Sequence, residues 1–337
     1  MKSTKQKNYI NLLKVIAMLF VVCMHVISKA MPNYDYNSNT YHILLFIDIL
    51  LRTSVPLFIF MSGNLMLNKN YSIKNILFKL IKYYLLFIVF NSMYMVADSL
   101  MIQHTPLDVK NILVSGVTLK SVYQMWYFKL LLLTYASVPI FQYIISKKSK
   151  ILDFITLLVL IIAFLILPNL LGGKYFEICY FLVFLLYYYL GYFIKKYEFK
   201  FENILLLVLF GLCYYYTFTK SYIFDHNYYY LNFQLSNMLI LSLSFFKIFS
   251  SIDKYLTNNK LNKVFKYLSQ YSFYIFIFHG LVIGLLNKIH IINIYEYNNL
   301  LLIITNTIIV YVATLIVSII LKELKKLLIN LYKKVRN

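Results

Sequence analysis

The sequence predicts an all-α integral membrane protein, built as one bundle of about ten transmembrane helices with both termini in the cytoplasm. Two observations indicate this fold class. First, 61% of the 337 residues are hydrophobic and only 13% are charged, whereas soluble domains are about 45–50% apolar and about 25% charged. Second, proline and glycine are scarce, at 5 and 8 residues, which suits the long uninterrupted helices that lipid favours.

The chain contains ten segments that can cross a bilayer as helices. A crossing helix needs about 20 predominantly apolar residues, and each segment approaches or exceeds that length. No cleavage site follows the first segment, so it is expected to stay in the protein as a membrane anchor. The ten segments comprise residues 9–29, 42–67, 77–97, 122–145, 151–170, 175–194, 203–219, 231–249, 271–289 and 298–321.

The basic residues are distributed unevenly between the two sides of this topology. With the amino terminus inside, 24 of the 33 fall on the cytoplasmic side, 7 on the opposite side and 2 within spans. This pattern follows the positive-inside rule. The net charge of +21 therefore indicates topology and contact with anionic lipid headgroups rather than nucleic-acid binding. We expect a single domain over residues 1–337, ending in a basic interfacial helix at about 321–337.

The cysteines and histidines carry no metal-binding or disulfide pattern. Cys23, Cys179 and Cys213 are isolated in or near apolar segments, which predicts buried thiols. The histidines are scattered without paired ligand spacing, so no metal site is predicted. No bound cofactor is expected either.

Ionisable residues inside spans are costly and therefore mark candidate functional positions. Lys14 and His25 are separated by 11 positions in the first span. At about 100° per residue they share one helix face, about 16 Å apart along its axis. One face then carries a cation near the cytoplasm and an imidazole toward the outside. The alternative is that Lys14 snorkels to the interface while His25 bonds a neighbouring carbonyl group.

Three further spans carry polar residues at a depth similar to that of the first-span histidine. Asp48 and Arg52 share a face of the second span, and Arg52 is the only arginine before the carboxy-terminal tail. A rigid guanidinium fork suggests a geometric need, although a purely structural ion pair is the alternative. Trp126 and Lys129 begin the fourth span, where tryptophan also serves as an interfacial anchor. His279 lies near the middle of the ninth span, slightly deeper. We predict that these side chains converge on one polar chamber.

Six segments carry a resemblance that covers nearly the full length of the chain. They are NYINLLKVIAMLFVVCMHV, RTSVPLFIFMSGNLML, SIKNILFKLIKYY, QMWYFKLLLLTYASVPI, FLLYYYLGYFIKK and YLSQYSFYIFIFHGLVI. In this order they resemble the acyltransferase 3 family of bacterial membrane acyltransferases. Lys14 takes the place of the family's first-span arginine, and Gln124 stands where many members have histidine. The stand-alone layout is most similar to the subgroup of polysaccharide intercellular-adhesin modification proteins and enterobacterial common antigen O-acetyltransferases.

The resemblance implies a multi-pass O-acyltransferase of the cytoplasmic membrane. It would move an acyl group, with acetyl favoured, from a coenzyme A thioester to a hydroxyl of a cell-envelope polysaccharide or lipid-linked sugar. An imidazole base would take the hydroxyl proton, and nearby cations would stabilise the oxyanion. The residues implied are His25, Arg52, Asp48, Lys129 and His279 for catalysis; Trp126, Tyr127, Ser62, Tyr135 and Tyr274 for substrate contact; and Lys14, Lys79 and Lys82 for the phosphates of the donor.

Two other functions remain open at the level of sequence. An exporter or flippase for a polysaccharide or lipid-linked sugar would use the same bundle and polar chamber. A structural subunit is the second alternative, but it would not need Arg52 and His279 inside spans. Expected partners are the acyl donor, the envelope glycan, membrane lipids and glycan-synthesis proteins. The acceptor, the choice between acetyl and succinyl, and the oligomeric state are left open.

Overall fold

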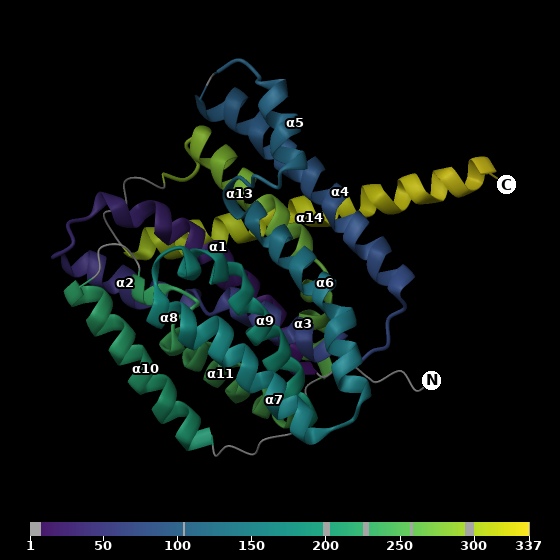
Figure 1. The fold of residues 1–337 in the computed structure, drawn as a ribbon. Coiled ribbons are helices and arrows are strands. Elements are labelled where there is room, and N and C mark those ends of the chain that lie inside the picture. Colours follow the sequence, from purple (N-terminus) through teal and green to yellow (C-terminus); the bar gives the residue numbers. More distant parts are fainter. Residues whose placement is uncertain are drawn as a thin grey trace.

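The computed structural model describes residues 8–103, 105–197, 203–224, 229–256, 259–293 and 300–336. The described residues are 87% helical and contain no strand, which confirms the predicted all-α fold class. Long helices pack side by side into a bundle, and the last of them extends well beyond it (Figure 1). Large apolar side chains, such as Ile151, Leu170 and Ile204, are more than 70% exposed on the outer faces, as lipid contact requires.

The long helices correspond to the predicted spans, with short helical turns at several of their ends. The helices are α1 (Asn8–Ala30), α2 (Asn39–Leu51), α3 (Ser54–Met66), α4 (Ile73–Ala97), α5 (Val109–Val117), α6 (Trp126–Ser146), α7 (Lys150–Ile161), α8 (Leu167–Leu171), α9 (Gly173–Tyr197), α10 (Asn203–Phe224), α11 (Ser236–Ser251), α12 (Asn259–Ser269), α13 (Ser272–Lys288) and α14 (Leu300–Arg336). The short turns are η1 (Met31–Asn33), η2 (Asp98–Gln103), η3 (Tyr123–Met125), η4 (Ile162–Ile166), η5 (Tyr229–Leu231) and η6 (Ile252–Tyr255).

Within the described residues, nine helical stretches are long and apolar enough to cross a membrane, and a bent pair makes a tenth. The bent pair is α12 and α13, which meet at 59°. The predicted ninth span therefore begins at a corner rather than in a straight helix. The second span is also interrupted, because α2 ends at Leu51 and α3 begins at Ser54. Arg52 lies at this break, where it is the C-cap of α2.

Contacts between the first and last spans show that the described chain starts and finishes at the same end of the bundle. The Ser269 hydroxyl at the end of α12 donates to Asn11 Oδ1 near the start of α1, at 3.2 Å. The Lys322 ammonium, late in α14, donates to Gln270 Oε1 at 2.8 Å. A chain that begins and ends on one side crosses an even number of times, which favours ten crossings. Residues 321–336 continue α14 without a break.

Glycine allows the closest helix crossing in the bundle, between α3 and α9. A Cβ added to Gly63 would overlap the Tyr188 carbonyl oxygen, and one added to Gly191 would overlap the Phe60 carbonyl oxygen. The two backbones therefore touch, as small residues permit in membrane helix pairs. Both glycines lie in segments that the sequence comparison had selected, and their role is to set the distance between α3 and α9.

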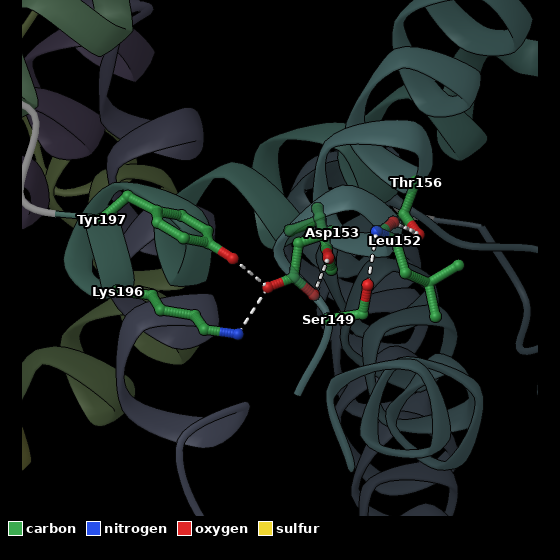
Figure 2. Close-up of polar contacts among 7 residues, drawn as sticks. Ser149, Leu152, Asp153, Thr156, Lys196 and Tyr197 are labelled. Carbon is green, nitrogen blue, oxygen red and sulfur yellow. Dashed lines mark hydrogen bonds and ion pairs between the residues drawn. The ribbon is translucent and has the colours of Figure 1, made fainter. Parts of the chain in front are cut away.

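A buried carboxylate ties α7 to the end of α9 at the side of the bundle where the chain begins. Asp153 is fully buried, and its carboxylate accepts bonds from the Lys196 ammonium and the Tyr197 hydroxyl, both at 2.5 Å (Figure 2). The Tyr189 hydroxyl donates to the other carboxylate oxygen at 3.2 Å. A buried charge needs such partners to offset the loss of hydration. This cluster stabilises the α7–α9 contact, and it was not foreseen from the sequence.

Candidate functional site

Two histidines from different spans face each other in the middle of the bundle. His25 on α1 and His279 on α13 have ring centroids 5.0 Å apart, with their planes inclined at 42°. The two helices run in the same direction and pack against each other, which brings the two rings to the same depth. The sequence predicted both residues as members of one chamber, and the structure shows that they form a pair.

The bonds of His279 determine which of its ring nitrogens is free to act. The side chain is fully buried, and Nδ1 lies 3.0 Å from the Ile275 carbonyl oxygen. A carbonyl can only accept, so Nδ1 carries the proton and the neutral ring holds its lone pair on Nε2. That Nε2 is buried and has no hydrogen-bond partner among the described residues. An unpartnered buried lone pair is costly, and it is the arrangement that a general base requires.

A tyrosine hydroxyl from α4 is inserted into α13 beside His279. The Tyr94 hydroxyl donates to the Ile277 carbonyl at 2.7 Å and accepts from the Leu281 amide at 3.2 Å. The Gln124 amide, on η3, also donates to this hydroxyl. A Cβ on Gly280 would lie 2.8 Å from the Gln124 amide and 2.9 Å from the hydroxyl. Gly280 therefore leaves room for a clamp that fixes α13 next to its histidine.

An elongated cavity of about 310 Å³ opens from the end of the bundle where the chain begins. Four of the predicted site residues line it: Lys14, Ser62, Tyr127 and Tyr135. Much of the remaining lining is apolar and comes from α1, α3, α6 and α13, including Val21, Val55, Phe58, Leu131, Phe273 and Phe276.

The inner end of this cavity lies next to the histidine pair. The Tyr127 and Phe276 rings, both in its lining, have centroids 4.8 Å apart, and the Phe276 centroid lies 6.1 Å from that of His279. On α1, Lys14 lines the cavity and lies 11 residues before His25. A thin molecule that entered at the lysine would thus extend toward the imidazoles.

Two tyrosines of the cavity lining, Tyr83 and Tyr135, lie beside Lys79 and Lys82, which are not themselves in the lining. The Lys79 ammonium lies 4.0 Å from the centroid of the Tyr71 ring and 5.1 Å from that of Tyr135. The Tyr83 ring is stacked on Tyr135 at 5.0 Å, and the Lys82 ammonium lies 5.9 Å from it. Burial, followed by the neighbouring Tyr83, raises the pKa of Tyr71, so this phenol is neutral and attracts Lys79 through its ring face.

The acid–base pair of the second span forms as the spacing predicted. Arg52 Nε donates to Asp48 Oδ2 at 2.8 Å, and the Asp48 side chain is almost completely buried. The other carboxylate oxygen, Oδ1, is buried and has no hydrogen-bond partner in the part of the chain that the structure describes. Arg52 lies close enough to interact electrostatically with His25 on α1 and Tyr180 on α9. The guanidinium therefore adds a permanent positive charge to the surroundings of the histidine pair.

Three predicted residues lie elsewhere. Trp126 packs against Phe181 and Phe184 of α9, with ring centroids 6.3 Å apart in each case. The Lys129 ammonium lies 5.8 Å from the Phe181 ring centroid, so it too is directed at α9. Tyr274 is half-buried and contacts the Phe273 ring, but it is absent from the cavity lining. No contact between these three side chains and the histidines is seen among the described residues.

The histidine pair also borders a second opening at the opposite end of the bundle. Val21, His25 and Lys29 follow one another at intervals of four on α1, so they share a face. Val21 lines the elongated cavity, whereas Lys29 lines a small hollow of about 40 Å³ with Tyr94, Asp98 and Gly280. On α13 the order is the same: Phe276 lines the first opening and Gly280 the second. On both helices the histidine therefore lies between residues that line the two openings, although neither imidazole is part of either lining.

These features describe a membrane-embedded helical bundle with a pair of imidazoles between openings at its two ends. The sequence matches the family model of an acyltransferase domain over residues 7–323. The chain belongs to this family and is a multi-pass membrane acyltransferase. Searches of curated proteins and of solved structures gave no significant match.

Gln124 and Tyr94 were not identified from the sequence as the residues that contact α13 beside His279. Gln124 was noted only as a departure from the family pattern, and Tyr94 was hidden among the many aromatic residues of its span. A glutamine at the start of an apolar helix has to find polar partners, and this was the available signal. Tyr94 offered no signal of its own, because a tyrosine near the end of a span normally faces the interface.

Proposed function

We propose that the protein transfers an acyl group, preferably acetyl, from coenzyme A to a hydroxyl of an envelope polysaccharide or lipid-linked sugar. It would do so in the cytoplasmic membrane, with both termini in the cytoplasm. The elongated cavity then faces the cytoplasm, where acyl-coenzyme A is made. The excess of lysines at this end of the bundle follows the positive-inside rule and supports that orientation. Glycan-synthesis proteins are the expected partners.

The elongated cavity suits the thin arm of an acyl-coenzyme A. Its apolar inner walls would surround the thioester end, while Lys14, Lys79 and Lys82 would hold the phosphates as point charges. The stacked Tyr83 and Tyr135 rings in the cavity lining offer a surface for the flat adenine base. Lys14 and His25 are about 16 Å apart along α1, so the arm would carry the acyl group from the membrane surface to the centre.

The chemistry is one addition and one elimination. The acceptor hydroxyl oxygen forms a bond to the thioester carbonyl carbon while a histidine takes the hydroxyl proton. The carbon–sulfur bond then breaks, the sulfur leaves with the electron pair, and the histidine returns the proton to it. His279 Nε2 holds the lone pair that this role requires, and His25 is placed to bind or relay the same proton.

The Arg52–Asp48 pair would stabilise the negative charge that develops on the carbonyl oxygen. The Arg52 guanidinium interacts electrostatically with His25, and Asp48 fixes its direction through the 2.8 Å bond. A fixed cation in a water-poor site stabilises an oxyanion strongly, because it needs no reorganisation during the reaction. In this scheme Lys129 and Trp126, which contact Phe181 on α9, do not touch the reacting atoms.

The observation that carries the proposal is the unpartnered His279 Nε2 beside His25, between two openings at opposite ends. The test uses membranes that contain the wild type, His25→Ala or His279→Gln, supplied with radiolabelled acetyl-coenzyme A and envelope polysaccharide. We expect label on the polysaccharide with the wild type and loss of at least about 100-fold with either variant. Polysaccharide that crosses the membrane without being acylated would instead indicate the exporter.

A further inference from the structure

Two adjoining hollows on the side away from the elongated cavity have no role in the scheme so far. The small one of about 40 Å³ reaches Gly280, and the larger one of about 250 Å³ lies between α4, α5 and the segment that leads to α6. Asp98, at the start of η2, lines both. The larger hollow, beside the α4–α5 hairpin, and the smaller one, which reaches the residue next to His279, therefore meet at Asp98.

The lining of the larger hollow has the groups that recognise sugar hydroxyls. It combines two carboxylates, an amide, two hydroxyls and one ammonium with three apolar side chains. The polar members are Asp98, Ser99, Asp108, Asn111, Ser115 and Lys120. Carboxylates accept from hydroxyl groups, an ammonium donates to them, and an amide does both. A polyhydroxylated ring can bond to all of these groups, whereas an acyl chain of a lipid can bond to none.

The smaller hollow lies between this surface and the residue that follows His279. The Tyr123 hydroxyl donates to Asp98 Oδ1, which fixes the carboxylate where the two hollows meet. Lys29, one turn beyond His25 on α1, interacts electrostatically with Asp98 across the small hollow. The buried, unpartnered Nε2 belongs to His279, whose neighbour Gly280 forms the inner wall. A hydroxyl held at this inner wall would lie beside the residue that follows His279, although His279 itself is not in the lining of the hollow.

We propose that these hollows, centred on Asp98, form the acceptor subsite and hold a sugar unit of the glycan with Asp108 and Asn111. This proposal rests on the proposed function. It adds that the acceptor enters from the outer side through the α4–α5 hairpin, while the donor enters from the cytoplasm. The two substrates then meet at the histidine pair from opposite directions.

The variants are Asp98→Asn and Asp108→Asn, which replace a carboxylate with a group of the same shape. Asp108 Oδ1 caps α5 by accepting from the Asn111 amide at 2.9 Å, and asparagine caps a helix equally well. The matched control is Asp35→Asn, because Asp35 is an exposed carboxylate that accepts from the Asn37 amide at 2.7 Å in another loop.

The experiment measures transfer kinetics in purified membranes with polysaccharide extracted from a strain that lacks the gene. We expect Asp98→Asn and Asp108→Asn to raise KM for the polysaccharide about tenfold. KM for acetyl-coenzyme A should stay at the wild-type value, as should both constants of Asp35→Asn. Unchanged KM for polysaccharide in both variants would overturn the acceptor subsite, and so would an equal rise in both KM values. Failure of the wild type to transfer from any acyl-coenzyme A would instead contradict the proposed function.

Discussion

Replacing Gly280 with alanine tests whether Tyr94 and Gln124 position His279, the histidine proposed as the base. The new Cβ would lie 2.8 Å from the Gln124 amide and 2.9 Å from the Tyr94 hydroxyl, whereas nonbonded contacts to carbon settle at about 3.5 Å or more. The clamp must therefore retreat by about 0.6 Å. The Leu281 amide, now 3.2 Å from the hydroxyl, would then be too distant to bond.

The loss of one buried hydrogen bond corresponds to about 0.5–1.5 kcal/mol of stability, which a folded variant tolerates. Its effect on the reaction should be larger, because a displacement of about 1 Å in catalytic geometry costs up to about 100-fold in rate. We expect Gly280→Ala to lower kcat for acyl transfer by about 10- to 100-fold while KM for acetyl-coenzyme A stays within about twofold.

The assay compares kcat and the thermal midpoint of detergent-purified Gly280→Ala with those of Gly211→Ala. Gly211 lies within α10, where a Cβ would meet no atom within 4 Å, so this control receives the same substitution without the collision. It should retain wild-type kcat. A wild-type kcat for Gly280→Ala at unchanged stability would refute the positioning role of the clamp.

Three further predictions follow from the site and the fold. Both His25→Ala and His279→Gln should lower the rate of acyl transfer by about 10²- to 10⁴-fold, with protein levels and thermal midpoints measured alongside. A rate within tenfold of the wild type in either variant would show that the residue takes no part in the chemistry. Lys79→Gln should raise KM for acetyl-coenzyme A about tenfold with kcat unchanged, whereas the exposed Lys74→Gln should change neither, and equal effects would place the phosphates elsewhere. Gly191→Ala should destabilise the protein by about 1–3 kcal/mol because α9 must move away from the Phe60 carbonyl. The thermal midpoint of this variant is compared with that of Gly211→Ala, and equal midpoints would contradict the close α3–α9 contact.

The parts of the fold that follow from local rules were predictable from the sequence. Span positions depend on runs of apolar residues, and their edges came within a few residues of the observed helices. The Asp48–Arg52 ion pair follows from a spacing of four on one helix. The bend between α12 and α13 was not predictable, because Gln270 and Tyr271, at the corner, are not helix breakers.

For the candidate site, the sequence predicted which residues take part but not how they are arranged in space. His25 and His279 were recognised because imidazoles inside spans are costly, but their 5.0 Å pairing depends on how α1 packs against α13. The packing of α6 against α9 directs Lys129 toward Phe181, although its sequence position suggested the chamber. The hollow around Asp98 was not predicted because residues 98–121 lie between two predicted spans and carry no recognisable motif. Only the folded α4–α5 hairpin brings the polar side chains of the hollow together.

The central claim is that the two substrates approach one histidine pair from opposite sides of the membrane. The most direct measurement uses sealed inverted vesicles that contain the protein, with envelope polysaccharide trapped in the lumen and labelled acetyl-coenzyme A added outside. The account predicts labelled luminal polysaccharide with the wild type and none with His25→Ala. Label that appears on polysaccharide only after detergent opens the vesicles would contradict it, because both substrates would then bind on the same side.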